Sequence, residues 1–304
     1  MAKEFRITDD HEGRRVDRFL RSRFPEVPLG AIMKALRTGE VRLDAKRALP
    51  DTRLKCGQLL QTPWEDVAAA AVFGQERLQA RLPLETIYKD DYAWIVNKPA
   101  GLLTQPDVKG GDSLITRALC QLNWSRNDFR PATVQRLDRN TSGVVVIAMN
   151  GKSQRYLSQL IRERKIRKTY WAIVEGEVPK SGRIDLPLLK CPEKNIVVVS
   201  KKGQKALTLY KQIKRCERAS LVELELITGR PHQARVHMAA IGCPILGDVK
   251  YGGLAKKAGR QLLHARTVEF PDDPALPDGM RGGLFTAALP EDMEKFLKLK
   301  FPDC

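Results

Sequence analysis

A chain of 304 residues with 42% hydrophobic and 29% charged residues has the balance of a folded globular protein, which excludes an intrinsically disordered one; its length fits one large plus one small domain. Lys and Arg number 53 against 36 Asp and Glu, giving a formal net charge of +17. Such a surplus favours a polyanionic partner, most commonly nucleic acid, although basic residues can also serve solubility alone.

Positive charge is concentrated near the N-terminus, where residues 13–60 hold twelve Lys and Arg and five Asp and Glu. Apolar residues recur at helical spacing in residues 16–20 and again in residues 32–36, after two prolines. Residues 38–49 begin with a Gly-led turn and alternate in polarity, which predicts a strand hairpin. We therefore predict a small N-terminal α/β domain over residues 1–63. The basic side chains expected on its outer face are Arg14, Arg15, Arg18, Lys34, Arg37 and Arg42.

Residues 64–82 differ in composition, with a run of four alanines, flanking charges and one glycine. This composition predicts a partly helical linker between two domains. The remaining residues, 83–304, form the larger predicted domain.

Strand-like apolar runs and turns alternate throughout residues 83–304. Two β-type runs flank the pair Asp90 and Asp91, which is a hairpin signal, and a Lys-Pro-Ala-Gly loop follows. Five further runs are predicted to be strands: residues 143–149, 169–178, 195–200, 206–213 and 220–229.

Two segments of the same region have helical patterns. Apolar residues recur at helical spacing in residues 152–167, and a second helix can begin at Pro231 and end at Gly242. Strands outnumber helices and often follow one another directly. We therefore predict an α+β domain with a mixed, mostly antiparallel sheet, and not a doubly wound parallel one.

One acidic residue, Asp138, stands in the polar segment 135–143, QRLDRNTSG, immediately before an apolar run. A loop that leads into a buried strand is a setting in which catalytic residues are often found. The polar residues 140–142 are expected to hydrogen-bond the local backbone. The simple alternative is that Asp138 pairs with Arg136 or Arg139, or caps a turn.

Several reactions that use carboxylates are disfavoured by what surrounds Asp138. Glycoside hydrolysis needs two carboxylates in comparable settings, and metal-assisted phosphodiester cleavage needs carboxylate or His clusters. Nucleotide hydrolysis needs a Gly-rich phosphate loop, which the sequence lacks. Covalent catalysis by Asp138 on an electrophilic carbon remains open, since arginines are available to keep the carboxylate ionised.

Cysteines and histidines do not predict a metal centre. The six cysteines are scattered without a C-x-x-C pair, and His232 and His237 have no adjacent cysteine cluster. No apolar stretch approaches the roughly 18 residues of a membrane span, and residues 1–15 lack the apolar core of a signal peptide. We expect a cytoplasmic protein with reduced thiols.

Four segments resemble, in order and spacing, the motifs of the RluA family of RNA pseudouridine synthases. Residues 136–143, RLDRNTSG, match the family signature R-L-D-x-x-T-S/T-G. Residues 96–103 resemble its N-K-P-x-G segment, and residues 167–176 its K-x-Y motif. Residues 227–248 resemble its T-G-R-x-H-Q-x-R-V-H block and the G-x-P-I-x-G-D segment that follows. The resemblance extends from about residue 13 to residue 300.

The predicted N-terminal domain, through RVDRFL at residues 15–20 and LRTGEVRLDAKR at residues 36–47, resembles the S-four-like RNA-binding domain. Within the family it is most similar to the RluC type, which modifies large-subunit (23S) ribosomal RNA. The resemblance therefore implies a ribosomal RNA substrate, a pseudouridine synthase fold, and an isomerisation that needs no cofactor.

The resemblance also implies roles for single residues. Asp138 matches the nucleophilic aspartate, and Arg235 matches its basic partner. Tyr170 matches the tyrosine that stacks near the target base and is a candidate general base. Arg136 matches an arginine that fills the space of the extruded nucleotide. Gln135 departs from the family, which usually has His at this position, and Gln cannot titrate near neutral pH.

Further RNA contacts are expected from the same motifs and from the basic end of the helix over residues 152–167. The side chains expected to make them are Arg164, Lys168, Arg230, His232 and Gln233.

Other functions remain open at this point. The same chemistry on transfer RNA is one, although the compact members that act there often lack the N-terminal domain. A non-catalytic RNA-binding factor of ribosome assembly would explain the charge, but not the joint occurrence of Asp138, Tyr170 and Arg235. A DNA-binding regulator is disfavoured because no recognition-helix pattern stands out. We expect a monomer with ribosomal RNA as its partner, no membrane association and no small-molecule cofactor.

Overall fold

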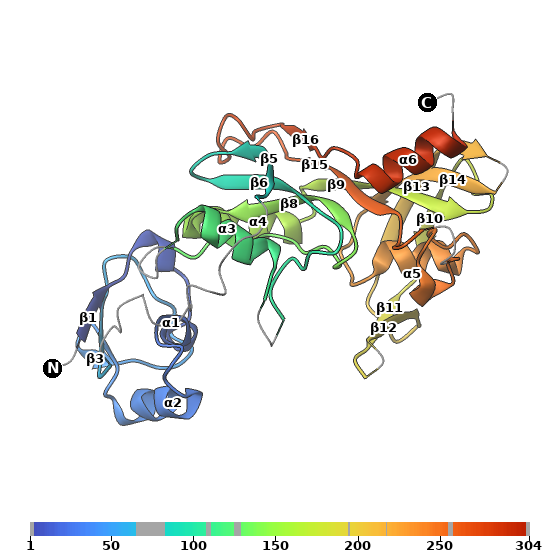
Figure 1. Ribbon diagram of the computed structural model, residues 1–304. Coiled ribbons are helices and arrows are strands. Elements are labelled where there is room, and N and C mark those ends of the chain that lie inside the picture. The colour runs from blue at the N-terminus through green and yellow to red at the C-terminus, as the bar shows by residue number, and fades with distance from the viewer. Residues whose placement is uncertain are drawn as a thin grey trace.

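The computed structural model covers most of the chain. It describes residues 3–64, 83–107, 111–124, 129–193, 195–216, 218–254 and 258–301. The predicted linker, residues 64–82, lies outside these ranges except for its first residue. The described chain forms a small N-terminal unit and a larger body built on one sheet (Figure 1). Within these ranges, no helix has the length and apolar character that crossing a membrane requires.

The N-terminal unit lies at one end of the molecule (Figure 1). Its elements are β1 (Lys3–Arg6), η1 (Asp9–His11), α1 (Val16–Arg23), α2 (Leu29–Thr38), β2 (Arg42–Leu43), β3 (Lys46–Arg47) and β4 (Leu59–Thr62). The predicted helix pair and the β2–β3 hairpin are confirmed. The sheet is larger than predicted, because β4 pairs with both β1 and β2 and gives the order β1-β4-β2-β3.

The apolar faces of α1 and α2 form the core of this unit. Phe19 and Leu20 of α1 are buried with Ile32 and Leu36 of α2 in one cluster. Helix α2 ends at Gly39, whose φ of 80° lies in the left-handed region that glycine adopts at little cost. The apolar spacing of the sequence therefore places both helices with their charged faces outward.

The larger body contains a ten-stranded sheet. Eight of its strands follow the order β10-β13-β14-β9-β15-β8-β6-β5, and the other two are β16, beside β15, and β7, beside β8. Its strands are β5 (Glu85–Lys89), β6 (Ala93–Lys98), β7 (Ala132–Thr133), β8 (Ser142–Ala148), β9 (Arg167–Glu175), β10 (Ser181–Asp185), β13 (Leu207–Cys216), β14 (Ala219–Leu226), β15 (Leu263–Glu269) and β16 (Leu284–Thr286). Among the pairings of the named strands in this sheet, β15–β8 is parallel and the rest are antiparallel, which confirms the predicted mixed, mostly antiparallel sheet. A separate hairpin consists of β11 (Leu188–Cys191) and β12 (Ile196–Val199).

Helices cover both faces of the large sheet. They are α3 (Leu114–Gln121), α4 (Gly151–Arg162), α5 (Gln233–Ala240) and α6 (Glu291–Lys300). Helices α3 and α5 share a core cluster with Val145 and Ile147 of β8, whereas α4 packs with Val144 and Val146 on the opposite face. All seven residues of β8 are buried, as expected of a strand that is covered on both sides. The predicted strands, the hairpin at residues 90–91 and both predicted helices are confirmed.

Three neighbouring strands bring the start of β8 close to Tyr170. Gly143 of β8 pairs with Ala265 of β15, and Ala265 pairs with Tyr170 of β9. Gly143 has a φ of 114°, and a Cβ at this position would overlap the carbonyl group of Ala265. Only glycine fits so close an approach, so Gly143 allows the start of β8 to lie against β15, one strand away from Tyr170 on β9.

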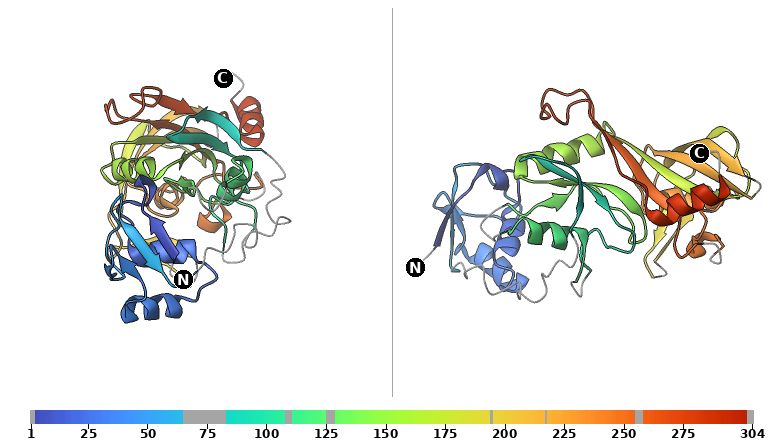
Figure 2. Two further views of the ribbon diagram at one scale, coloured as in Figure 1. Left: turned by 90° about the vertical axis from the view of Figure 1, so that its left-hand side faces the viewer. Right: turned by 45° about the horizontal axis from the view of Figure 1, so that its top comes forward.

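The contact between η1 and α4 joins the N-terminal unit to the larger body. The amide of Gly151, the first residue of α4, donates to Asp10 Oδ1 at 2.7 Å. Arg155 Nη1 donates to the carbonyls of Asp9 and Glu12 at 3.0 and 3.1 Å. A Cβ on Gly151 would overlap the Asp10 backbone, so the two bodies touch directly here. Figure 2 shows the N-terminal unit against this end of the larger body.

A candidate active site around Asp138

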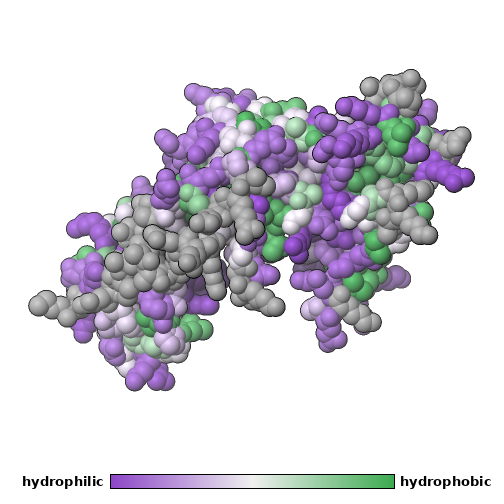
Figure 3. Space-filling model, viewed as in Figure 1, coloured by the Kyte–Doolittle hydropathy of each residue, from purple (hydrophilic) through white to green (hydrophobic). Residues whose placement is uncertain are grey.

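A pocket of about 830 Å³ lies where residues 134–140 meet the start of α5 and the β11–β12 hairpin. Among its described lining residues, Asp138 is the only acid. The cations that line it are Arg136, Arg139, Lys168, Lys190, Arg230, Arg235 and Lys250. A concave lining with this charge suits a ligand that carries phosphates. Hydrophilic side chains also cover much of the face drawn in Figure 3, on both bodies.

Side chains from a neighbouring strand end and loop hold the backbone on either side of Asp138. Thr104 Oγ1 donates to the carbonyl of Leu137 at 2.8 Å and accepts from the Leu137 amide at 3.1 Å. Lys98 Nζ donates to the carbonyl of Arg139 at 3.0 Å. The residues before and after Asp138 are therefore both fixed by hydrogen bonds to other segments.

Lys98 is fully buried at the end of β6. Besides the bond to the active-site loop, its ammonium donates to the carbonyls of Pro99 and Leu102 at 3.0 and 2.7 Å. Burial and then the charge of Arg260 lower the pKa of Lys98 to about 7, while the charge of Asp138 acts in the opposite direction. Only the protonated ammonium has a hydrogen for each of its three carbonyl acceptors. The sequence motif contains this lysine, but the pattern alone assigned it no role.

The hydroxyl groups of Thr141 and Ser142, after Asp138, do not bond the local backbone as predicted. The Thr141 amide donates to the Asp138 carbonyl at 3.1 Å and closes a turn, but the Thr141 hydroxyl has no partner within the described residues. Ser142 Oγ lies 3.0 Å from His264 Nδ1, 122 positions away in the sequence. The prediction that these hydroxyls bind local backbone is wrong, because the pairing of β8 with β15 brings Ser142 to the distant His264 and the Thr141 hydroxyl finds no partner among the described residues.

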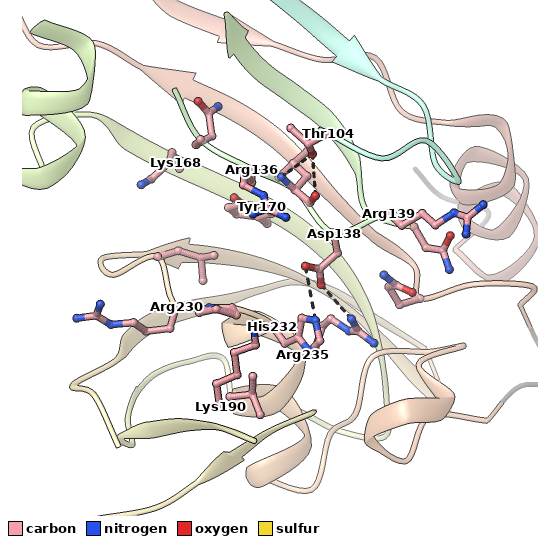
Figure 4. Close-up of a pocket in the computed structure, with 18 of the residues that line it drawn as sticks. Thr104, Arg136, Asp138, Arg139, Lys168, Tyr170, Lys190, Arg230, His232 and Arg235 are labelled. Atoms are coloured by element: carbon pink, nitrogen blue, oxygen red, sulfur yellow. Dashed lines mark hydrogen bonds and ion pairs between the residues drawn. The ribbon is translucent and has the colours of Figure 1, made fainter. Parts of the chain in front are cut away.

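Arg235, on α5, is held between two carboxylates. Its Nη1 donates to Asp138 Oδ2 at 2.9 Å, and its Nε and Nη2 donate to Asp248 at 2.7 and 2.8 Å. Burial by itself would lower the pKa of Arg235, but the hydrogen bonds and charges of Asp248 and Asp138 outweigh it and raise the pKa above its usual value. Arg235 therefore remains a cation and directs one charged donor at the Asp138 carboxylate (Figure 4).

Tyr170 borders the same space as Asp138 (Figure 4). Its side chain comes from β9 and is buried, with 8% of its surface exposed. Burial first, and then the charge of Asp138, raise the pKa of the Tyr170 phenol well above its usual range. Burial and the charge of Asp138 both oppose ionisation of the phenol. Tyr170 can therefore contact a ligand through its ring face and its neutral hydroxyl.

His232 stands directly against the ion pair. It precedes α5 with a φ of 53°, and its Nε2 lies 3.8 Å from Asp138 Oδ1. The Tyr251 hydroxyl accepts from the Val197 amide at 3.0 Å and lies 2.6 Å from His232 Nδ1. This contact holds the ring with its Nε2 facing Asp138, and the tautomer of the neutral ring depends on which way the hydroxyl proton of Tyr251 points. Burial lowers the pKa of His232, with Asp138 opposing, which favours this neutral form.

Gln233 requires a correction, because its side chain is turned into the protein. It is 2% exposed, and its amide oxygen accepts from the Thr228 hydroxyl and the Arg230 amide at 2.7 and 3.0 Å. Its amide nitrogen donates to Leu207 O and Thr208 Oγ1 at 2.9 and 3.0 Å. All its hydrogen-bonding capacity is used inside the chain, so Gln233 holds the start of α5 and is not available to RNA.

The other side chains expected to contact RNA fall into two groups. Arg136, Lys168 and Arg230 line the pocket together with His232. The rest lie outside it. Those that are exposed are Arg18, Lys34, Arg37, Arg42 and Arg164, whereas Arg14 and Arg15 are half-buried. Arg15 is also paired with Asp17 at 2.9 Å, which makes it a weaker candidate for a phosphate contact.

Gln135 also lines the pocket, and its amide oxygen is buried without a hydrogen-bond partner among the described residues. Three residues with clear roles at the site were not singled out from the sequence. They are Lys98, Asp248 and Tyr251. The first two stand in segments that match motifs of the sequence, but no periodicity indicates that a buried Asp248 would meet Arg235.

The family described as RNA pseudouridylate synthase matches residues 91–240, a range that contains Asp138, Tyr170 and Arg235. Ribosomal large subunit pseudouridine synthase C of Vibrio parahaemolyticus is 35% identical over 280 residues, which cover 87% of this chain and 87% of that protein. The protein of the same name from Escherichia coli is 36% identical over 86% of this chain and 82% of its own length. Ribosomal large subunit pseudouridine synthase D of Xanthomonas campestris is 31% identical over 96% and 90%.

A solved structure is similar as well. Human RNA pseudouridylate synthase domain containing 4 superposes with a TM-score of 0.57 at 27% identity, covering 70% of this chain and 91% of that one.

Proposed function

This chain belongs to the RluA family of RNA pseudouridine synthases, and from that premise we propose that it isomerises specific uridines of large-subunit (23S) ribosomal RNA to pseudouridine. The observation that carries the proposal is the 2.9 Å contact between Arg235 and Asp138 in a basic pocket beside Tyr170. The names of the bacterial relatives, which refer to the large ribosomal subunit, support the choice of substrate.

The chemistry needs one ionised carboxylate beside the ribose. Pseudouridine formation breaks the bond between uracil N1 and ribose C1′, turns the base, and joins its C5 to C1′. The C5 hydrogen leaves as a proton and N1 gains one, so there is no net oxidation or reduction. Asp138 either assists loss of the base and of a ribose proton, or adds to C1′ or to the uracil ring. On each route Arg235 holds the Asp138 carboxylate with a charged hydrogen bond at 2.9 Å and fixes its direction.

The target base must leave its stack before it can enter the pocket, at a cost of about a few kcal/mol. Arg136, which is exposed at the pocket, is proposed to fill the vacated space, and Tyr170 to pack on the extruded ring. Lys168 and Arg230 are proposed to hold flanking phosphates, which position the RNA without reading its sequence.

The domain boundaries are part of the proposal: an S-four-like RNA-binding domain over residues 1–63, a linker over 64–82 and the catalytic domain over 83–304. Lys34, Arg37 and Arg47 border a hollow of about 420 Å³ on α2 of the N-terminal unit, which supports a role in RNA binding. We further propose that the protein works in the cytoplasm, because its proposed partner is ribosomal RNA, and that it works as a monomer.

The first test is release of tritium from a 23S ribosomal RNA transcript that carries the label on C5 of uracil. The wild type is expected to release label, whereas Asp138→Asn should release none while binding the RNA as tightly as the wild type. A transfer RNA transcript labelled in the same way serves as the second substrate.

Each result decides between the alternatives. Release from transfer RNA alone would keep the chemistry and reject the proposed substrate. Tight binding of both RNAs without release would favour a non-catalytic binding factor. Gln135→His would then be the first substitution to test for release.

A further inference from the structure

Arg260 connects helix α6 to the loop that carries Asp138. Its Nη1 donates to the carbonyl of Asn140 at 3.0 Å, and to the carbonyls of Gln261 and Leu263 at 2.9 and 3.4 Å. Its Nε and Nη2 donate to the two carboxylate oxygens of Asp292 at 2.7 and 2.8 Å. The Arg260 side chain is only 10% exposed. One guanidinium group therefore bridges the C-terminal helix and the active-site loop.

The bond to Asn140 acts two residues after Asp138. The preceding carbonyl, that of Arg139, accepts from Lys98 Nζ at 3.0 Å. Two consecutive carbonyls after Asp138 thus accept from cations that come from distant segments of the chain. Such charge-assisted hydrogen bonds are roughly twice as strong as neutral ones. Together they fix the direction in which the backbone leaves Asp138.

Helix α6, which carries Asp292, is packed against the larger body. Met293 and Leu297 of α6 are buried in a cluster with Leu262 and with Ile173 of β9. Asp292 stands in the first turn of the helix, where an acidic side chain is favoured by the helix dipole. The anchor of Arg260 is therefore part of a packed element, although Asp292 itself is 45% exposed.

We propose that Arg260 and Asp292 are positioning residues for the reaction at Asp138: Asp292 orients Arg260, and Arg260 holds the carbonyl of Asn140. Neither residue lines the pocket. The inference rests on the proposed function, since its effect is measured as a rate. A displacement of about 1 Å in an active site can cost about 10²-fold in rate, so a looser loop should slow the chemistry without weakening RNA binding.

A purely structural ion pair would behave differently. Exposed pairs contribute little to stability, and the loss of such a pair changes the unfolding temperature slightly but not the rate of the folded enzyme. Rate and stability therefore have to be measured on the same variants.

The experiment compares single-turnover tritium release, RNA affinity and thermal unfolding for the wild type, Arg260→Gln, Asp292→Asn and the double variant. Glu291→Gln is the matched control, because Glu291 precedes Asp292 on α6 but pairs with Lys295 at the surface, at 2.5 Å. Arg260→Lys is the conservative variant, since one ammonium can reach Asn140 or Asp292 but does not reproduce the fork of a guanidinium.

Both single variants are expected to slow release by about tenfold or more at temperatures where they are folded, with RNA affinity unchanged. The double variant should be no slower than Arg260→Gln, because Asp292 acts through Arg260. Arg260→Lys should recover part of the rate, and Glu291→Gln should match the wild type.

Wild-type rates in both single variants, additive losses in the double variant, or losses explained by weaker RNA binding would each overturn the inference. If the wild type itself released no label, the proposed function would fall and this inference with it.

Discussion

Asp248 and Arg235 form a bidentate pair, at 2.7 and 2.8 Å, that is almost completely shielded from water. The Asp248 side chain is 1% exposed and that of Arg235 is 9% exposed. Because two of its nitrogens are used on Asp248, Arg235 turns its third nitrogen to Asp138. A carboxylate outside the pocket thus orients the cation inside it.

Removing the charge of Asp248 should harm both stability and activity. In Asp248→Asn the buried guanidinium loses the more buried of its two carboxylate partners and keeps only Asp138, which should destabilise the fold by about 3 kcal/mol and slow tritium release. Urea unfolding measures the first effect. The control is Asp272→Asn, because Asp272 pairs with Arg281 at the surface and should change stability by less than about 1 kcal/mol. Equal effects of the two substitutions would contradict this account.

Substitutions of Tyr170 should separate its ring from its hydroxyl. Tyr170→Phe keeps the face on which an extruded base can stack, so RNA affinity should stay at the wild-type level. Tyr170→Ala removes the face and should weaken binding by about 1–3 kcal/mol. Both are measured in the Asp138→Asn background, so that no turnover occurs during the titration. Equal affinities of the Phe and Ala variants would exclude stacking as the role of this residue.

Acid should destabilise the protein through His264, whose buried ring contacts Ser142 and the carbonyl of Ala287 at 3.0 and 3.4 Å. Burial lowers the pKa of His264 to about 4. In the unfolded chain His titrates near 6.5, so between about pH 6.5 and 4 the unfolded state binds the extra proton. The contribution of the neutral ring is therefore complete above pH 6.5 and is lost as the pH falls toward 4.

The comparison that tests this is wild type against His264→Gln, which has no such proton to bind. The free energy of unfolding of the wild type, relative to the variant, should fall by about 2 kcal/mol between pH 7 and pH 5. Parallel curves across this range would mean that His264 does not titrate as described.

The junction of the two bodies should open when Gly151 is replaced by alanine. Alanine is the better helix former, so α4 itself should not suffer, but its Cβ would overlap Asp10 and push η1 away. Small-angle scattering should then report a larger radius of gyration, and cleavage by protease between the bodies should be faster. Lys152→Ala, at the next and exposed position, is the control. An unchanged scattering profile would show that the junction tolerates the extra carbon.

Much of the fold and part of the site could be predicted because the signals are local. Turn residues marked the hairpins at residues 42–47 and 85–98, and apolar spacing marked α1, α2 and α4. Strand β1 and its pairing with β4 were missed, since Lys3 to Arg6 are mostly exposed and show no apolar run.

The sequence by itself determined that an acidic residue would stand in a polar loop before a buried strand, and which motifs would accompany it. Only the tertiary structure decided which side chains meet there. Arg235 and Asp138 are 97 positions apart, and His232 faces the pocket while the adjacent Gln233 is buried inside the chain. The physical reason is that periodicity sets only the local face of a residue. Contacts between distant segments depend on strand register and on close approaches such as that of Gly143 to Ala265.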